Sequence, residues 1–183
     1  MCTAFSAWQR INNQRRDPDL VCQEYKRALT HLSFCCELYN IQIANGHYFL
    51  HEHPQQARSW SEKVVQQLLA APGVEKVVAH QCQFGACDSK GSPIKKPTCF
   101  MSNSPAIRDE LERTCTGRDG YCSYHPGEVH VKCCGMTARR AAIFPFLLCK
   151  AILKGFREQL KRDGIYEQGV VGLHHVDYSE RAH

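Results

Sequence analysis

The chain has 183 residues, a length that suits one domain, or one incomplete large domain, with a real apolar core. Hydrophobic residues make up 43% and charged residues 22%, a balance that excludes a disordered chain. The formal net charge is +5, and its basic residues are spread along the sequence. A polyanionic partner is therefore permitted but not required.

The chain contains 12 cysteines, a number that in a secreted protein would predict a disulfide framework. Its N-terminal segment has no long apolar core and no small-residue cleavage pattern, so it does not resemble a signal peptide. No apolar run reaches the roughly 18 to 20 residues of a membrane span. We therefore expect reduced thiols in a soluble intracellular protein, nuclear or cytoplasmic, with no membrane partner.

The first half of the chain predicts a loop, a long helix and a strand. Residues 1 to 20 carry turn and charge signals. Apolar residues then recur at alternating spacings of four and three, which predicts a helix from about 20 to 45 that stops at Asn45-Gly46. His47–Pro54 follows as a short apolar strand that ends at a proline, with a carboxylate and two imidazoles near its end.

The pattern beyond residue 54 continues with alternating helices and strands. Ser59-Trp60-Ser61-Glu62 matches a capping box and predicts a helix that ends at Pro72-Gly73. The order helix, strand, helix, strand predicts a mostly parallel sheet. The two later strands, however, are joined by a loop without a helix, so they are open to antiparallel pairing. We expect these strands at 74–80 and 98–102, helices at 104–113 and 144–161, and a hairpin near 128–133 within irregular loops at 115–136.

Two motifs together resemble the DNA cytosine-5 methyltransferases. The first is Cys2-Thr3-Ala4-Phe5-Ser6, and the second is the strand that ends in Glu52. In that family a Pro-Pro-Cys-Gln-x-Phe-Ser loop carries the nucleophilic cysteine, and a later strand ends in Glu-Asn-Val. Cys2, Phe5 and Ser6 match the first motif, and Glu52 matches the second.

The resemblance extends into the second half of the chain. Phe84-Gly85 stands where the family has Tyr-Gly, and Lys95-Lys96 precedes a strand where the family has a Gln-x-Arg-x-Arg segment. The segment ending in Phe144-Pro145, with the helix after it, looks like the last conserved helix of the family, whose start helps to bind the cofactor. The resemblance therefore implies a cofactor-binding role for Phe144 and Pro145.

The mechanism that the resemblance implies is methyl transfer from S-adenosylmethionine to cytosine. Cys2 would attack carbon 6 of a cytosine flipped out of DNA, and Glu52 would hold ring nitrogen 3 and the exocyclic amine. Lys95 or Lys96 would support the pyrimidine oxygen or the carboxylate. For this role, we expect Cys2 and Glu52 to approach each other. The side chains expected to contact the nucleic acid are Ser6, Arg15, Arg16, Arg139 and Arg140.

The sequence lacks one motif of the family, the Gly-rich loop that binds S-adenosylmethionine, because no Gly-x-Gly pattern follows a strand. The chain therefore resembles the C-terminal half of the catalytic fold: an α/β, partial Rossmann-like methyltransferase sheet with flanking helices. We expect an incomplete domain over 1–162 and a polar tail over 163–183. Such a fragment would not act alone, and an N-terminal half or a longer polyprotein would supply the cofactor site.

Two further functions stay open. Similar segments occur in polyproteins of copia-like retroelements, which favours a non-catalytic module that binds nucleic acid or protein. The other function is a zinc-stabilised structural domain. Strand alternation places His51 and His53 on one face and Glu52 on the other, so these three cannot form one metal site. No Cys-x-x-Cys motif occurs, and no metal ligand set is chosen from the available residues, which are Cys82, Cys87, Cys99, Cys115, Cys122, His125, Cys133 and Cys134.

Overall fold

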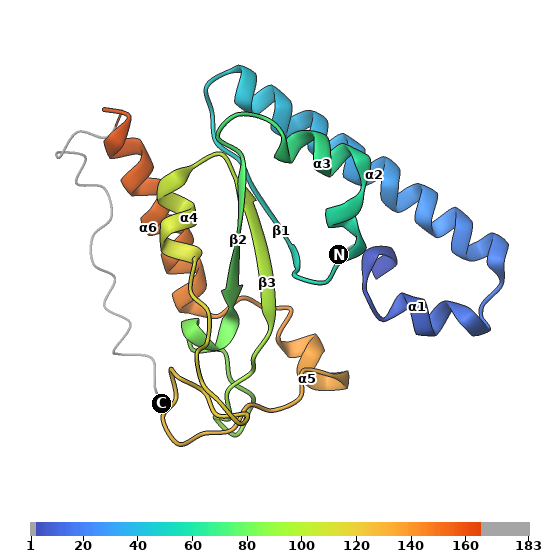
Figure 1. Ribbon diagram of the computed structural model, residues 1–183, viewed down its shortest axis with the longest axis vertical. Coiled ribbons are helices and arrows are strands. Elements are labelled where there is room, and N and C mark those ends of the chain that lie inside the picture. Colours follow the sequence, from blue (N-terminus) through green and yellow to red (C-terminus); the bar gives the residue numbers. More distant parts are fainter. Residues whose placement is uncertain (1–2, 166–183) are drawn as a thin grey trace, which may run out of the picture.

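The computed structural model describes residues 3–165 and has a mixed α/β architecture (Figure 1). A three-stranded sheet lies between two layers of helices, with α2 and α3 on one face and α4 and α6 on the other. The helices are α1 (Gln9–Asn12), α2 (Pro18–Ala44), α3 (Lys63–Leu69), α4 (Pro105–Leu111), α5 (Gly135–Arg140) and α6 (Phe146–Arg162). The strands are β1 (Leu50–Pro54), β2 (Glu75–His80) and β3 (Pro97–Ser102).

The sheet has the order β1-β3-β2, and β3 is antiparallel to both neighbours. The expectation of a mostly parallel sheet is therefore wrong for the described strands. The strand, helix, strand order does make β1 and β2 run in the same direction, but it does not determine which strand lies between them. The loop after β2 contains no α-helix, so β3 returns antiparallel to β2 and lies between β1 and β2. The sequence had left this antiparallel pairing open.

Two apolar cores lie on the two faces of the sheet. Successive residues of β3 pack into one core and then the other, because successive side chains of a strand point to opposite faces. Cys99 and Met101 pack against α2 and α3, whereas Phe100 packs against α4 and α6. In β1, Glu52 is paired with Phe100, and His51 is paired with Met101. Glu52 therefore lies on the α6 side, and His51 lies on the α2 side.

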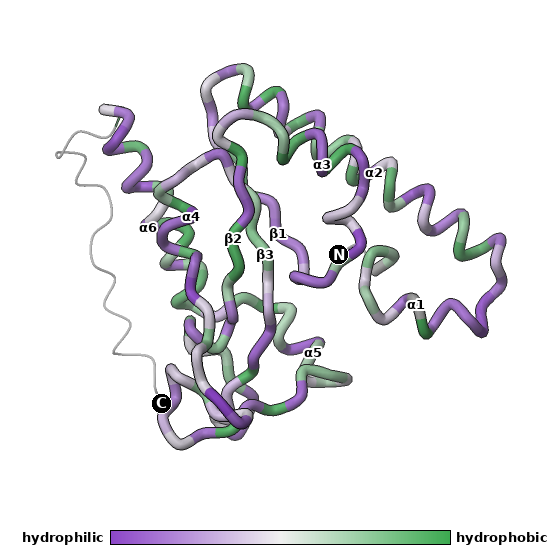
Figure 2. The backbone as a smooth tube through the Cα atoms, in the orientation of Figure 1, coloured by the Kyte–Doolittle hydropathy of each residue, from purple (hydrophilic) through white to green (hydrophobic). Residues whose placement is uncertain are grey.

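The long helix α2 begins and ends close to the predicted residues. Asp17 caps it by accepting the backbone N–H of Asp19 at 2.9 Å, and Pro18 occupies the first turn, where a proline costs no hydrogen bond. It ends before Gly46, which has a φ of 70° that glycine adopts without strain. Figure 2 shows hydrophobic and hydrophilic residues alternating along α2, as expected for a helix with one buried face.

Helices α3, α4 and α6 were also located from the sequence, whereas α1 and α5 were not. Ser104 caps α4 as predicted, because its Oγ accepts the N–H of Ile107 at 3.3 Å. The expected capping box at Ser59 is wrong, since Ser59 lies in a 3-10 turn and Glu62 precedes α3 without a side-chain cap. The segment before α2, predicted to be a loop, contains short helical turns. These turns are too short to show an apolar period in the sequence. The 3-10 turns are η1 (Thr3–Phe5), η2 (Asn13–Arg15), η3 (Arg58–Ser61) and η4 (Gln81–Phe84).

Two long segments, which are mainly loops but include η4 and α5, lie beyond the end of β2, at the bottom of Figure 1. We call residues 81–96 and 112–145 the loop lobe. It contains only isolated pairings, including a parallel bridge between Ile94 and Val131, and a small apolar cluster. Within residues 3–165, no helix has the length and apolarity needed to cross a membrane.

Candidate metal centre

Three thiols and one imidazole converge inside the loop lobe. The side chains are those of Cys82, Cys115, Cys122 and His130, and their ligand atoms all lie within 4.8 Å of one another. The three cysteines are buried and form a cluster of their own. Thiolates and imidazoles are the usual zinc ligands, and four of them form a closed structural site.

The end of β2 positions the first two ligands. Cys82 lies in η4, the 3-10 turn that directly follows the strand and ends at Gly85 with a φ of 79°. The backbone N–H of Cys115 donates to Nδ1 of His80 at 2.8 Å, and the backbone N–H of His80 donates to the Arg113 carbonyl at 2.9 Å. These bonds hold the segment that carries Cys115 against the strand end, beside Cys82.

A short hairpin brings the other two ligands together. Tyr121 and Val129 pair across it, so that the neighbouring residues Cys122 and His130 also come close. The chain reverses in a His-Pro-Gly-Glu turn over 125–128, where the Glu N–H donates to the His carbonyl at 3.1 Å and the glycine has a φ of 82°. Proline and glycine at the two central places are the signature of a type II turn.

The geometry of Cys115 and His130 fits two ligands of one zinc ion. Sγ of Cys115 lies 3.6 Å from Nε2 of His130. Zinc bonds of about 2.3 Å to sulfur and about 2.0 Å to nitrogen, at a tetrahedral angle, separate the two ligand atoms by about 3.5 Å. Nδ1 of His130 lies 2.8 Å from the Gly120 carbonyl, which can only accept, so Nδ1 carries the proton. The lone pair of Nε2 is thereby directed to the cluster, as in known zinc sites.

Hydrogen bonds prepare Cys115 for the thiolate form. Burial opposes ionisation, but hydrogen bonds from Ser123, the Gly117 backbone and Cys82 outweigh it and lower the pKa of Cys115 to about 6. The backbone N–H and the hydroxyl of Ser123 lie 3.4 Å and 3.5 Å from Sγ. Burial raises the pKa of Cys82 to about 12, against a hydrogen bond from Gln83. A metal cation would reverse that cost, because it favours the deprotonated thiol.

Sequence reasoning named three of these four ligands without separating them from the other cysteines. It missed His130 and named His125, which lies in the reversing turn outside the cluster. The available signal was the Pro-Gly turn, which pairs residues on either side of it. Cys99 is buried on the α2 side of the sheet, and the exposed thiols of Cys87 and Cys134 are not in the cluster.

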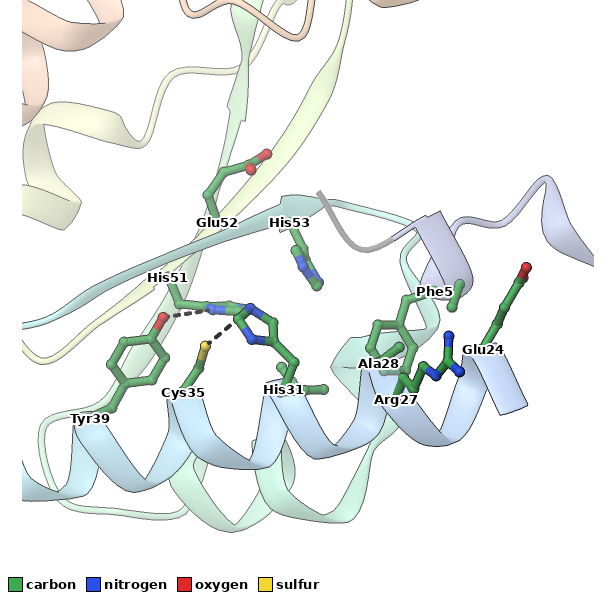
Figure 3. Close-up of a pocket in the computed structure, with 12 residues that line it drawn as sticks. Phe5, Glu24, Arg27, Ala28, His31, Cys35, Tyr39, His51, Glu52 and His53 are labelled. Atoms are coloured by element: carbon green, nitrogen blue, oxygen red, sulfur yellow. Dashed lines mark hydrogen bonds between the residues drawn. The ribbon is translucent and has the colours of Figure 1, made fainter. Parts of the chain in front are cut away.

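The imidazoles and the carboxylate of β1 are separated, as strand alternation predicted. Figure 3 shows His51 and His53 directed toward α2 and Glu52 directed away from it. Nδ1 of His51 lies 3.1 Å from the Tyr39 hydroxyl, and His53 contacts the Ser59 hydroxyl. Burial, with help from His53, lowers the pKa of His51 to about 4, so its ring is neutral.

A cleft of about 610 Å³ separates α2 from β1 (Figure 3). It is lined by the imidazoles of β1, by Tyr39 and by the N-terminal residues Ala4 and Phe5. Cys2, the predicted nucleophile, lies outside the described residues. Ala4 and Phe5, which follow it in the sequence, share this cleft lining with Glu52.

Three predicted site residues lie on the α6 side of the sheet: Glu52 and Lys96, predicted for cytosine chemistry, and Phe144, predicted to bind the cofactor. Burial raises the pKa of Glu52, and the charge of Lys96 opposes that shift from nearby. Phe144 packs edge-to-face on Phe100, the cross-strand neighbour of Glu52, at a centroid distance of 6.2 Å. Lys96 also donates from Nζ to the Ala141 carbonyl at 2.8 Å.

Lys95 and Pro145, the other two predicted site residues of this region, lie at its margins. The charge of Lys95 acts on His80, whose pKa is lowered by burial first and by Lys95 second, so Lys95 lies toward the metal cluster. Pro145 is the residue before α6, where its backbone begins the helix. Neither position shows a role in chemistry at Glu52.

The predicted nucleic-acid contacts come from separate elements. Arg16 makes two hydrogen bonds to Glu24, at 2.9 Å and 2.6 Å, so its guanidinium is already paired. Ser6 accepts the Trp8 backbone N–H at 3.4 Å, and Arg15 is exposed. Arg139 and Arg140 are exposed at the end of α5 in the loop lobe.

The chain matches no protein-family model, no curated protein and no solved structure.

Proposed function

We propose that the chain is a zinc-binding structural module, in which one Zn²⁺ on Cys82, Cys115, Cys122 and His130 holds the loop lobe against the end of the sheet. The observation that carries this proposal is the convergence of four ligand atoms within 4.8 Å of one another. They come from separate segments: the turn after β2, the loop after α4 and the hairpin. A single ion would therefore join all three.

Apart from Phe84 and Phe144, which pack on the α6 side of the sheet, the loop lobe has few other means of holding its shape. Its apolar cluster consists of Ala86, Ile94 and Ala141 with two half-buried neighbours, and its backbone pairings are isolated. Structural zinc contributes about 10 to 16 kcal/mol of apparent binding free energy at neutral pH. A whole domain is stable by only about 5 to 15 kcal/mol. The metal can thus decide whether the lobe is folded.

The competing explanation is a cluster of buried, reduced thiols without a metal. Buried free cysteines are common and need no function. Two features favour zinc. The tautomer of His130 leaves Nε2 free for a metal. The backbone N–H and the hydroxyl of Ser123 donate to the sulfur of Cys115, which stabilises a thiolate rather than a thiol. Zinc-bound thiolates must stay reduced, which supports an intracellular location for the chain.

Metal analysis of the full chain tests the proposal. Protein purified under reducing conditions should hold one equivalent of zinc, and cobalt should replace it with the absorption bands of a tetrahedral thiolate site. Cys122→Ser should lose the metal and lower the melting temperature. Cys87→Ser, an exposed cysteine of the same lobe, should change neither. Less than a tenth of an equivalent in the wild-type chain, with no cobalt bands on reconstitution, would overturn the proposal.

A second candidate function is that of a cytosine-5 methyltransferase-like fragment, with the partial Rossmann-like sheet that this implies. The gathering of Glu52, Lys96 and Phe144 on one face favours it, because a carboxyl with a raised pKa can donate a proton to a ring nitrogen. The missing N-terminal half would then have to add its strands at the β1 or β2 edge. This proposal makes DNA the partner and S-adenosylmethionine the cofactor.

Calorimetric titration with S-adenosylmethionine tests this second candidate. Binding that is retained in Cys122→Ser but lost in a Phe144→Ala variant would support it. An absence of heat at millimolar concentration would reject methyl transfer by this chain on its own, and would leave the zinc proposal untouched.

A further inference from the structure

We propose that the loop lobe is a binding surface for single-stranded nucleic acid. This inference rests on the proposed zinc site, because the zinc holds the segments that carry the surface. It goes beyond that site in naming the partner.

The positive charge of the chain is concentrated in the loop lobe. The loop lobe, residues 81–96 and 112–145, contains eight lysines and arginines but only four aspartates and glutamates. In the rest of the chain, basic and acidic residues nearly cancel. Clustered lysine and arginine on one part of a protein is the electrostatic footprint of a polyanion-binding surface. The formal net charge of +5 is therefore mostly a local property.

Several basic side chains outside the loop lobe have carboxylate partners, whereas most of those inside it do not. Arg16 pairs with Glu24, Arg108 pairs with Glu75, and α4 and α6 carry further pairs. Within residues 3–165, Arg113 is the only lysine or arginine of the loop lobe that takes part in an ion pair, and its partner is Glu110. The other cations of the loop lobe form no ion pair with a carboxylate among the described residues, so their charge is available to phosphate groups.

Backbone contacts bring several of these cations together. Ile94 and Val131 form a parallel bridge, so the residues that follow them, Lys95 and Lys132, lie side by side. Lys96 reaches the Ala141 carbonyl at 2.8 Å, which places the same segment beside the end of α5. α5 ends in Arg139 and Arg140, both exposed. The result is one basic surface built from three segments.

Two exposed tyrosines lie in the hairpin that carries the zinc ligands. Tyr121 and Tyr124 are 49% and 45% exposed, and they flank the buried ligand Cys122 in the sequence. A tyrosine ring held by a rigid backbone can stack on a nucleic-acid base, and basic residues beside it can follow the phosphates. Stacking needs unpaired bases with open faces. The partner that fits is therefore a single strand rather than a duplex.

The salt dependence of binding tests the basic surface. The zinc-loaded full chain is titrated against a fluorescent oligothymidylate, with anisotropy recorded at several salt concentrations. The test variant carries Lys95→Gln, Lys132→Gln and Arg140→Gln. The matched control removes three cations elsewhere, through Lys26→Gln, Lys154→Gln and Arg162→Gln. In single strands each lost phosphate contact lowers the slope of log K against log salt by about 0.7, so the test variant should lose about 2 and the control close to zero.

The tyrosines separate a nucleic-acid site from a general polyanion site. Tyr121→Leu with Tyr124→Leu should weaken oligothymidylate binding at least about fivefold, because each stacked base contributes about 1 to 3 kcal/mol. Heparin, which has no bases, should bind the tyrosine variant as tightly as the wild-type chain. A duplex of the same length should bind more weakly than the single strand. An equal affinity for the duplex, or an equal loss in the control variant, would overturn the inference.

The zinc content and melting temperature of each variant keep the two proposals apart. A zinc-loaded, folded chain that does not bind the oligothymidylate at low salt would refute the nucleic-acid surface and leave the zinc site standing. A chain without zinc would refute the zinc site. Binding that then persists in the zinc-free chain would show that the surface does not depend on the metal, which also contradicts the inference as stated.

Discussion

Cys115 and His130 lie 3.6 Å apart, from Sγ to Nε2, at the separation of two ligands on one tetrahedral zinc ion. Their backbones are held by different partners, because the N–H of Cys115 donates to Nδ1 of His80 and the N–H of His130 donates to the Gly120 carbonyl. The pair is thus positioned from both sides by backbone bonds. Each of the two proposed ligands can therefore be replaced while the other keeps its place.

The imidazole of His130 should be replaceable by another zinc ligand but not by an inert side chain. His130→Cys should keep one equivalent of zinc, since a site with four thiolates is also a stable structural site. His130→Ala should weaken zinc by more than about 100-fold, because a ligand contributes more than an outer-shell partner, whose loss costs about 10- to 100-fold. Competition with a chromophoric chelator measures both affinities. Equal zinc affinity in His130→Ala would exclude His130 as a ligand.

Gly117 should be required for the hairpin to close. A Cβ at this residue would lie 2.0 Å from the backbone oxygen of Tyr121, a contact that only a backbone shift can relieve. Gly117→Ala should therefore lower the free energy of unfolding by about 1 to 3 kcal/mol and weaken zinc binding. Chemical denaturation in the presence of zinc measures this. The adjacent and exposed Thr116→Ala should change stability by no more than about 0.5 kcal/mol.

His51 should make the free energy of unfolding fall in mild acid. Its pKa is lowered from 6.5 to about 4 in the folded chain, mainly by burial. Between these values the unfolded chain binds the proton and the folded chain does not, so stability is full above pH 6.5 and is lost as the pH falls toward 4. The total effect is on the order of 3 kcal/mol.

A His51→Phe variant isolates this effect from the release of zinc, which acid also promotes. The wild-type chain and the variant share the zinc site, so the difference between their stability curves over pH 4 to 7 reports His51 alone. The exposed His31→Gln is the control and should follow the wild-type curve. Parallel curves for wild type and His51→Phe would show that His51 takes up its proton in the folded state.

Glu52 should make the free energy of unfolding depend on pH in the opposite direction to His51. Burial raises its pKa, with partial opposition from Lys96, so the folded chain holds its proton more tightly than the unfolded chain. Its contribution to stability is present in acid and is lost as the pH rises through the raised pKa. Glu52→Gln should thus increase the free energy of unfolding at pH 7.5 and leave it nearly unchanged at pH 4. A loss of stability at pH 7.5 would show that the ionised carboxylate is well compensated by Lys96.

Local signals in the sequence predicted the helices and strands better than their arrangement. The apolar period of α2, its Asn45-Gly46 end and the Ser104-Pro105 start of α4 depend on neighbours within a few residues, and the structure confirms them. The place of β3 between β1 and β2 depends on residues far apart in the sequence. No local pattern distinguishes that order from a parallel sheet, because both orders satisfy the same alternation.

In the candidate site, too, local sequence patterns predicted individual side chains but not which distant residues come together. Alternation along β1 correctly separated Glu52 from His51 and His53, since that rule needs only one strand. The metal cluster, in contrast, needs a turn over 125–128 to bring His130 to Cys122, and a hydrogen bond from Cys115 to His80. The spacing of the ligands follows no short zinc motif, so composition alone could supply the thiols but not their partners.

The hydrogen bonds of His80 determine how far the loop lobe can unfold separately from the sheet. It is the last residue of β2, its backbone is bonded to the Arg113 carbonyl, and its ring is bonded to the N–H of Cys115. His80 therefore joins the sheet to the segment of the loop lobe that carries Cys115, and the two can open as separate cooperative units. A chelator should open the lobe to hydrogen exchange as far as His80 and stop there. The availability of zinc in the surroundings would then be translated into how much of the polypeptide is ordered.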